Sequence, residues 1–450
     1  MKLPASPPGI SPQTSWDKLS DERLGPELRA FIQQANANYY HWEELRHRPP
    51  PLGLTAEDAW VAVWGSRLNR KPLPLLDLKG RPFTYWLPEP TSRILHQVDR
   101  QGGGTVATDM SDTSLFNEMR ERVLIDSLME EAIATSQIEG AVTTRRVAKE
   151  MLRSGRQPKS RSEQMIANGY RTIRLLRQRI DRELSVDLLH EIQESMTLNT
   201  LDDPGQAGRF RAVDDVFVVD SRDNEVVFTP PPASDLSARI KRLVDFANEP
   251  PQSEPFIHPL VRASILHFWL AYEHPYADGN GRTARALFYW YMLKSGYWLF
   301  EFLTISRIIH AAPIKYYKAF LYSEHDDNDL TYFLSFQLEV TRKALADLHQ
   351  RLVELADEQR RMSALRVAAR LNVRQRAVLD HALRHPNQIY FFESHQHSHA
   401  IAYQTARTDL LDLAERGLLV EIGARRPREF VPAPDLRRKL DAAPFRKRRR

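Results

Sequence analysis

Residues 274–285 read His-Pro-Tyr-Ala-Asp-Gly-Asn-Gly-Arg-Thr-Ala-Arg, and this short stretch decides the fold. It brings a histidine, an aspartate, an asparagine, two glycines and two arginines together between two apolar, aromatic-rich segments, 265–272 and 286–293. Glycine lets a backbone approach a ligand closely, and the first amides of a helix have no partner within that helix. Such a turn binds anions, because unpaired N–H groups and the helix dipole both favour phosphate. Since a histidine can take a proton and an aspartate can hold Mg²⁺, the stretch indicates nucleotide chemistry.

This stretch resembles the signature of the Fic family, H-P-F-x-D/E-G-N-G-R-x-x-R, with Tyr276 in place of the usual phenylalanine. The neighbouring segments 267–272 and 283–288 are also similar to one branch of that family. The alternative is a structural Asx and glycine turn between two buried helices, but a turn needs no histidine and no pair of arginines. The resemblance implies a mainly α fold, namely the Fic helical bundle with a β-hairpin flap. It also implies transfer of AMP from ATP to a hydroxyl side chain of a target protein.

The resemblance implies a role for each residue of the signature. His274 would be the general base that deprotonates a Ser, Thr or Tyr hydroxyl, and its reference pKa of about 6.5 suits that task. Asp278 would hold Mg²⁺ between the α- and β-phosphates, and Arg282 would clamp a terminal phosphate with its planar guanidinium. The remaining nucleotide-binding expectations are Gly279, Asn280, Gly281, Arg285, Tyr316 and Tyr317. The first three would present N–H groups and an amide to phosphate. The two tyrosines resemble a pair near the nucleotide base, although aromatic residues at such places more often belong to a core.

A second motif lies upstream, where residues 135–140 read Thr-Ser-Gln-Ile-Glu-Gly. It resembles the S/T-x-x-x-E-G/N motif on the inhibitory helix of Fic proteins. The helical repeat puts Thr135 and Glu139 one turn apart on the same face. The resemblance implies that Glu139 pairs with Arg285 and competes with the γ-phosphate of ATP, so that the enzyme inhibits itself. An ordinary carboxylate at the end of a helix is the alternative.

The same fold supports other activities. Removal of AMP, with the glutamate orienting a water, is one alternative, and transfer of UMP or phosphocholine is another. A third alternative belongs to a different class, a DNA-binding regulator whose Fic domain senses a nucleotide. The resemblance also makes a homodimer plausible.

Residues 213–228 contain a hairpin signal, because two β-branched and aromatic runs flank a polar turn at 220–225. Fic proteins carry a flap here, and an exposed flap edge can pair with an extended target segment by strand addition. A surface hairpin that only packs on the bundle is the alternative.

Elsewhere the apolar positions have helical spacing. The predicted helices are 115–138, 162–179, 186–196, 236–247, 258–272 and 283–296, with the pattern continuing through 330–338. Ser185 and Asp235 precede two of these segments and are predicted to cap them.

Composition is that of an ordinary soluble protein, with 42% hydrophobic and 27% charged residues over 450 positions. No apolar run approaches the roughly 20 residues that a membrane span needs, and no signal-peptide pattern is visible. The absence of cysteine excludes disulfides, thiolate catalysis and cysteine-ligated zinc. The missing signal and the need for ATP favour a cytoplasmic location, without a membrane partner.

Four segments are predicted along the chain. An N-terminal accessory region, 1–110, is rich in proline and tryptophan, and Trp42, Trp60, Trp64 and Trp86 suggest a small packed lobe. The catalytic domain with its inhibitory helix covers 111–351, a third domain covers 362–437, and a basic tail covers 438–450.

The third domain resembles a winged helix-turn-helix, as many Fic proteins do at this end. Helices are expected at 372–383 and 402–416, and two short strands at 418–422 and 428–431. In such modules the second helix reads the major groove of DNA, with the wing on phosphate. The basic side chains of the wing favour DNA binding, namely Arg425, Arg426 and Arg428. The acidic side chains of the second helix oppose it, namely Asp409, Asp412 and Glu415. A protein-interaction or dimerisation wing is the alternative.

The basic tail can bind any polyanion, and it supplies much of the net charge of +5. A cluster of Glu393, His395, His397 and His399 has the residue types of a metal site, but a loop between helices without bound metal is the preferred interpretation.

Overall fold

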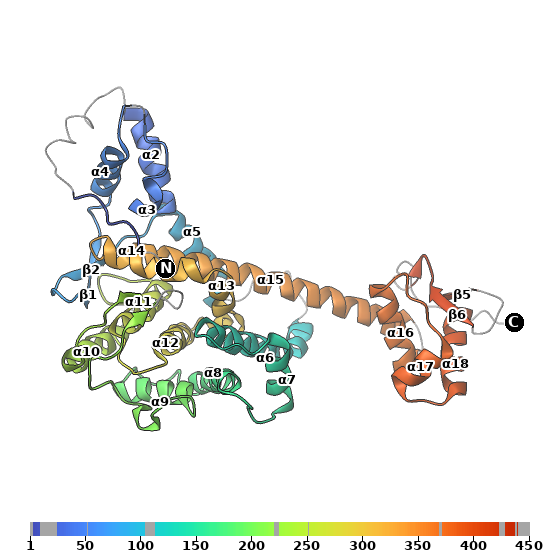
Figure 1. The fold of residues 1–450 in the computed structure, drawn as a ribbon. Coiled ribbons are helices and arrows are strands. Elements are labelled where there is room, and N and C mark those ends of the chain that lie inside the picture. Colours follow the sequence, from blue (N-terminus) through green and yellow to red (C-terminus); the bar gives the residue numbers. More distant parts are fainter. Residues whose placement is uncertain are drawn as a thin grey trace. The chain divides into compact units, whose positions relative to one another are not determined.

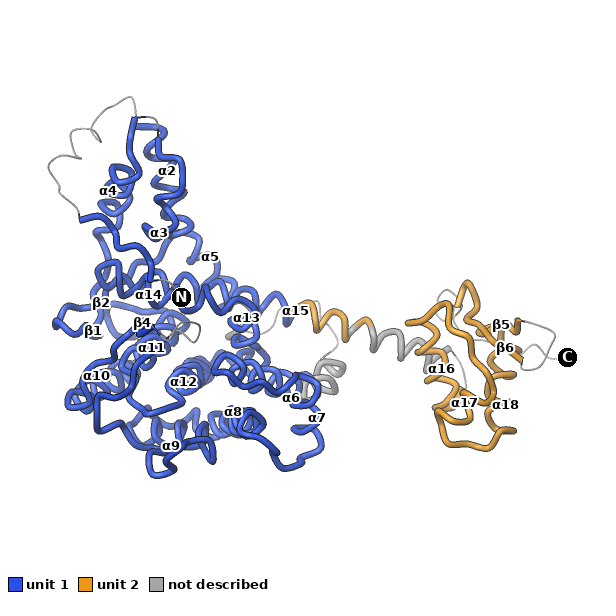
Figure 2. The backbone as a smooth tube through the Cα atoms, viewed as in Figure 1, with its two compact units in different colours: residues 1–348 blue, residues 349–450 orange. Residues whose placement is uncertain are grey.

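The computed structural model describes residues 3–9, 25–51, 53–103, 113–219, 225–250, 252–368, 371–422, 428–436 and 439. The chain forms two compact units, residues 1–348 and residues 349–450 (Figures 1 and 2). Helices dominate, so the mainly α fold predicted from the sequence is confirmed. None of the helices in the described ranges is long and apolar enough to cross a membrane.

The first unit begins with a small lobe. Its elements are α2 (Gly25–Asn38), α3 (Trp42–Leu45), α4 (Ala56–Ser66), β1 (Lys71–Leu76), β2 (Pro82–Tyr85), α5 (Glu89–Val98) and the π-helix η2 (Asp99–Gly103). As the tryptophan content suggested, Trp42 and Trp60 lie in one buried cluster, with Trp64 packed against it. Trp86 packs elsewhere, next to Tyr39 at a ring distance of 6.0 Å and against two later tyrosines.

A helical bundle follows the lobe. Its elements are α6 (Thr113–Ile138), α7 (Arg145–Ser154), α8 (Arg161–Arg177), α9 (Val186–Thr197), η3 (Pro204–Gln206), η4 (Ala233–Asp235), α10 (Leu236–Ala247), α11 (Pro259–Glu273), α12 (Asn280–Lys294), η5 (Trp298–Phe302), α13 (Ile305–Ala311), α14 (Pro313–His325) and α15 (Thr331–Ala368). Helices α11 and α12 pack along each other in the middle of the bundle (Figure 1). Both are buried on nearly all sides, which explains their continuous apolar and aromatic content.

The predicted helices agree with the bundle within a few residues at their ends. Ser185 caps α9 as expected, because its hydroxyl accepts from the Leu188 N–H at 3.1 Å. Asp235 also stands at the predicted N-cap position, that of α10, but its side chain makes no capping hydrogen bond and it is the last residue of the short 3-10 helix η4. Helix α12 begins earlier than predicted, because Gly279 in the left-handed conformation is already its N-cap.

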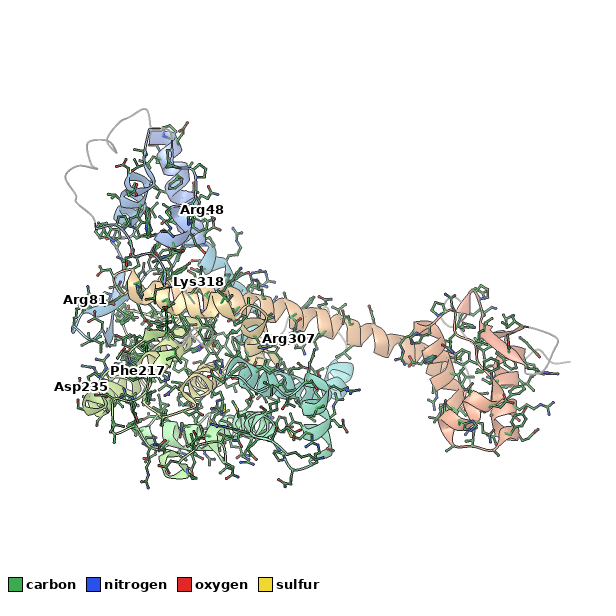
Figure 3. The ribbon with its side chains drawn as sticks, viewed as in Figure 1. Arg48, Arg81, Phe217, Asp235, Arg307 and Lys318 are labelled. Carbon is green, nitrogen blue, oxygen red and sulfur yellow. The ribbon has the colours of Figure 1, made fainter. Side chains whose placement is uncertain are left out.

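The predicted hairpin is present as β3 (Val218–Val219) and β4 (Val226–Phe228), which pair antiparallel. Residues 220–224 of its predicted turn lie outside the described residues. Phe217, just before β3, has 47% of its surface exposed (Figure 3). The Phe228 ring packs on Tyr272 of α11 at 5.1 Å, so the flap lies beside the end of that helix.

The second unit contains α16 (Val373–Arg384), α17 (Phe392–His399), α18 (Tyr403–Glu415), β5 (Leu419–Ile422) and β6 (Glu429–Pro432). The two strands form an antiparallel hairpin, and Tyr390 makes an isolated antiparallel bridge with Phe430. Along the described part of this unit the order is therefore a helix, an isolated bridge, two helices and a hairpin. Wing residues 423–427, and the basic tail apart from Lys439, lie outside the described residues.

The loop predicted around Glu393 is wrong, because this segment forms α17. Its start is closed by reciprocal bonds between Phe391 and Ser394, in which the backbone N–H of Phe391 donates to the Ser394 hydroxyl at 3.1 Å. The ring of His395 is buried and lies 3.2 Å from Asp409. Within the described ranges, no three or more His, Cys, Asp or Glu side chains are grouped to hold a metal ion.

Candidate active site

The end of α11 sets the direction of the His274 imidazole. His274 is the C-cap residue in the left-handed conformation, with φ 46°, and its N–H donates to the Leu270 carbonyl at 3.1 Å. Its Nδ1 lies 3.1 Å from the Ala271 carbonyl oxygen. Because a carbonyl only accepts, Nδ1 carries the hydrogen of the neutral ring, and Nε2 is left as the basic nitrogen. Burial lowers the pKa of His274 below its ordinary value, so the ring is neutral near pH 7.

The loop from Tyr276 to Gly279 is closed by side chains of the signature itself. The Asn280 amide accepts from the Tyr276 N–H at 2.9 Å and donates to the Tyr276 carbonyl at 2.7 Å. This amide is therefore occupied in shaping the loop, whereas the sequence led us to expect it on phosphate. Gly279 has φ 84°, and a β-carbon there would lie 2.7 Å from the Thr197 methyl group, so only glycine fits.

The first two turns of α12 carry two buried arginines. Arg282 donates to the Met196 carbonyl at 3.2 Å and to Asp278 at 3.1 Å. Arg285 donates through Nε to the Thr135 hydroxyl at 2.8 Å, and its Nη1 makes no hydrogen bond with any described residue. That Nη1 lies 3.3 Å from the position of a β-carbon on Gly281. The unpaired first-turn amides and this guanidinium form a site for an anion.

Glu139 occupies this anion site. Its Oε1 accepts from Arg285 Nη2 at 2.8 Å, which is the ion pair expected from the sequence. The same oxygen lies so close above Gly281 that any β-carbon on residue 281 would overlap it. Although burial opposes the charged form of Arg285, attraction to Glu139 raises the pKa of that guanidinium overall. The carboxylate thus lies where the α12 N-terminus and Arg285 would hold a phosphate.

Asp278 has the surroundings of a ligand for Mg²⁺. One oxygen accepts from the Gly279 N–H at 2.5 Å, the other lies 3.1 Å from Arg282, and 44% of the side chain is exposed. Magnesium is commonly held by one or two carboxylates together with substrate phosphates and water. A single partly exposed carboxylate next to an anion site fits that pattern.

The two tyrosines differ in their surroundings. Tyr316 is buried, with its hydroxyl 2.9 Å from His267 Nε2 in the core. Tyr317 is half exposed, and its hydroxyl lies 3.5 Å from the Ile138 carbonyl at the end of α6. Tyr316 therefore lies in the core next to Arg285, and Tyr317 lies at the edge of the site.

Sequence reasoning missed Arg211 and Gln193. The backbone N–H of Arg211 donates to the Pro275 carbonyl at 2.8 Å, and its Nε donates to the His274 carbonyl at 3.0 Å. The same guanidinium holds the Pro231 carbonyl at the base of the flap. Gln193 of α9 donates to the Asp278 carbonyl at 3.1 Å. Neither residue belongs to a local pattern, so no signal in the sequence points to them.

With this geometry established, comparison with known proteins identifies the class. Residues 183–292 match the Fic/DOC family. The matched range contains His274 and the loop that follows it.

The chain is similar to "Protein adenylyltransferase fic-1" of Caenorhabditis elegans, with 37% identity over 115 residues, 26% of this chain and 20% of that protein. It is also similar to "Protein adenylyltransferase Fic" of Nematostella vectensis, with 35% identity over 94 residues, 21% of this chain and 20% of that protein. The chain thus spans about a fifth of the length of the curated relatives it matches. A solved Fic family protein from Desulfovibrio desulfuricans G20 has a TM-score of 0.53 and 17% identity, covering 78% of this chain and 98% of that one. That likeness concerns the fold alone.

Proposed function

We propose that this protein is an adenylyltransferase, which transfers AMP from ATP to a Ser, Thr or Tyr hydroxyl of a target protein, itself included. The observation that carries the proposal is the juxtaposition of a neutral imidazole, whose Nε2 has no hydrogen bond to a described residue, and an anion site at a helix N-terminus. The names of the relatives, protein adenylyltransferases, support the same reaction.

In the proposed reaction the target hydroxyl donates its proton to His274 Nε2 as its oxygen attacks the α-phosphorus of ATP. The new bond joins that oxygen to the α-phosphorus, and the bond from the α-phosphorus to the bridging oxygen breaks. Pyrophosphate leaves, and the proton remains on the imidazole until it passes to solvent. Since transfer of this kind depends chiefly on alignment and charge, a fixed base and a preformed anion site account for most of what the protein must supply.

The nucleotide phosphates would lie on the α12 N-terminus. The amides of the first turn and Arg285 would hold them. Arg282 would also contribute once Asp278 binds a cation in place of the Arg282 guanidinium. Asp278 would hold Mg²⁺, which would neutralise charge on the phosphates. The flap would bind the target by strand addition along β3 and β4, whose Val219 and Val226 are half exposed.

We propose further that Glu139 restrains this reaction. Its carboxylate occupies the anion site and uses the hydrogen-bonding capacity of Arg285, so it would exclude the γ-phosphate by charge and volume. Removing it would free both the guanidinium and the space above Gly281.

The test is incorporation of label from ATP labelled in the α-phosphate, with parallel reactions labelled in the γ-phosphate. We expect Glu139→Gly to label itself and proteins of a lysate from the α-phosphate only, and His274→Ala in the same background to transfer nothing. Label from neither position, or preference for UTP in competition, would contradict the assignment to AMP. Loss of AMP from a previously modified protein, without any transfer, would favour the reverse reaction.

The surroundings of the acidic residues of α18 bear on a second function, DNA binding. Asp409 is buried, where it accepts from Arg374 and Asn372, each at 2.6 Å. Asp412 accepts from Gln375 at 2.8 Å. Two of the three carboxylates that opposed DNA binding are therefore used within the fold, and the outer face of α18 presents other side chains, namely Tyr403, Gln404, Arg407 and Thr408.

We propose that this face contacts a DNA major groove. Fluorescence anisotropy of the full chain with a labelled duplex, at two salt concentrations, tests the proposal. Arg407→Glu is expected to weaken binding, whereas Arg384→Glu, on α16, is the matched charge control. No binding by the parent chain would leave a protein-interaction wing as the better explanation.

A further inference from the structure

The N-terminal hairpin reaches the residue that precedes His274. Arg239 of α10 donates through Nη2 to the Leu76 carbonyl in β1, and through Nε to Glu273 Oε2 at 2.6 Å. The other oxygen of Glu273 accepts from Trp269 Nε1 at 3.0 Å. Glu273 is the last residue of α11 and is covalently joined to His274. Both of its oxygens are therefore held, one of them by an arginine bonded to the N-terminal hairpin.

The hairpin also packs on this part of α11. The Phe83 ring of β2 lies 5.4 Å from Phe268 and 5.1 Å from Tyr272. Glu273 and Arg239 are 1% and 7% exposed, respectively, so their ion pair is removed from water. Burying an ion pair contributes little net stability, because desolvation offsets the attraction, but breaking one leaves an uncompensated charge. The buried Arg239–Glu273 pair therefore fixes the relative position of the two side chains more than it stabilises the folded state.

The geometry that it fixes is unusual. His274 has a positive φ, which is uncommon for a residue with a β-carbon. On one side Arg211 holds the His274 carbonyl, and on the other side Glu273 is held by Arg239 and Trp269. Together these contacts determine where Nε2 points.

We propose that Arg239 and Glu273, braced by the N-terminal hairpin, are positioning residues that hold His274 in the orientation of a base. The proposal rests on the proposed function, since it concerns the base of that reaction, and it gives the N-terminal region a role in catalysis. Neither residue touches the anion site. They act on the reacting hydroxyl only through His274.

The chain offers a matched control at the other end of α11. Arg262 donates to Glu249 at 2.9 Å and to the Phe246 carbonyl at the end of α10 at 2.7 Å. This second arginine–glutamate pair joins α11 to the residues that follow α10, with Glu249 42% exposed, and it lies about three turns of helix away from His274. Glu249→Gln therefore perturbs a similar link without reaching the base.

The kinetic test uses the full chain in the Glu139→Gly background. The double variant Arg239→Met with Glu273→Leu removes both charges at once, so that no lone buried charge remains, and thermal unfolding verifies its fold. We expect kcat to fall about 10- to 100-fold, as a displaced catalytic group does, with KM for ATP unchanged. Glu273→Gln, which keeps a hydrogen-bond acceptor, should retain more activity, and Glu249→Gln should match the parent. Equal kcat in the double variant and in Glu249→Gln would overturn the proposal, as would a rise in KM that accounts for the whole loss.

A spectroscopic test needs no activity. With ¹⁵N-labelled histidine, the signals of His274 are assigned by their absence in His274→Ala, and they report which ring nitrogen carries hydrogen. We expect the Nδ1–H form in the parent and in Glu249→Gln, and a mixture of forms in the double variant. An unchanged tautomer in the double variant would contradict the positioning role. If the Glu139→Gly chain transfers no AMP, the proposed function fails, whereas these spectra still decide whether the pair holds His274.

Discussion

Arg285 joins α12 to the end of α6, because it donates to Glu139 at 2.8 Å, while its Nε donates to Thr135. The threonine and the glutamate are one helical turn apart, so one guanidinium binds both ends of the motif. Only the bond to Glu139 stands in the anion site. The bond to Thr135 holds α6 and α12 together.

This division predicts different effects for the two residues of the motif. Glu139→Gly and Glu139→Gln should both raise AMP transfer, and the gain should be larger for glycine, which also frees the space above Gly281. A hydrogen bond to a charged group contributes about 1.5–3 kcal/mol, so a gain of roughly tenfold or more is expected. Initial rates of labelling in the two variants and the parent measure it.

Thr135→Val is the control for that comparison. It removes the bond to Arg285 Nε but leaves the Glu139 carboxylate in place, so it should lower stability without relieving restraint. A gain from Thr135→Val as large as that from Glu139→Gly would show that loosening of α6, rather than vacancy of the anion site, controls the rate.

The pH dependence of transfer follows from the burial of His274. Burial lowers its pKa below the ordinary 6.5, and the base must be neutral to accept a proton. In the Glu139→Gly background, kcat should therefore fall as pH drops, with a midpoint below 6.5. Stability changes in the same direction. The unfolded chain binds the proton first, so this group favours the folded state above pH 6.5 and loses that contribution below it.

A pH–rate profile at saturating ATP tests the kinetic part. Asp278 also lies near the imidazole, and its negative charge raises the pKa of His274, against the effect of burial. Asp278→Asn should therefore move the midpoint further down, provided that residual activity can be measured. A midpoint above 6.5 would contradict the assignment of buried His274 as the base.

How far the sequence predicted this site depends on the distance along the chain between partners. His274, Asp278 and the two arginines lie within one contiguous stretch, so their chemistry is visible without a structure. Glu139 is distant, but its spacing from Thr135 matches a motif. The Asn280 amide was misassigned, because its partners belong to the backbone of the same loop and leave no trace in residue type.

Arg211 and Arg239 could not be predicted for a different reason. Arg211 holds a carbonyl 63 positions away, and Arg239 holds one 163 positions away. An arginine that binds backbone carbonyls depends on how helices and hairpins pack, and any surface arginine has the same local pattern. The start of α12 was predicted too late for a related reason, since Gly279 caps the helix by its conformation and not by a side chain.

The anchoring of α6 gives a further prediction. Glu131, buried two turns before Glu139, accepts from the Ser306 N–H at 2.9 Å at the start of α13, and also from the Ser306 hydroxyl. Glu131→Ala would leave these donors buried without a partner, which costs about 1–3 kcal/mol for each such group. Thermal and urea unfolding should therefore show a clear loss of stability.

Asp126→Asn is the control on the same helix. Asp126 bonds Lys149 and Arg153 at the surface, and exposed ion pairs contribute roughly 0–1 kcal/mol. A loss of stability in Asp126→Asn equal to that in Glu131→Ala would mean that burial of the carboxylate is not what matters at position 131.

Gly279 allows the two reasons for its glycine to be separated. Gly279→Ala introduces a residue at φ 84°, which costs roughly 1–2 kcal/mol, and it also drives a methyl group into Thr197. Thr197→Ser removes the opposing methyl group and keeps the hydroxyl that donates to the Gln193 carbonyl at 2.8 Å. The double variant should therefore recover part of the nucleotide affinity that Gly279→Ala loses, and the remainder measures the backbone strain. Calorimetric titration with ATP, in the Glu139→Gly background, measures both the affinity lost to the clash with Thr197 and the affinity lost to backbone strain. No recovery in the double variant would assign the whole effect to the backbone, and full recovery would show that the left-handed conformation at residue 279 costs nothing.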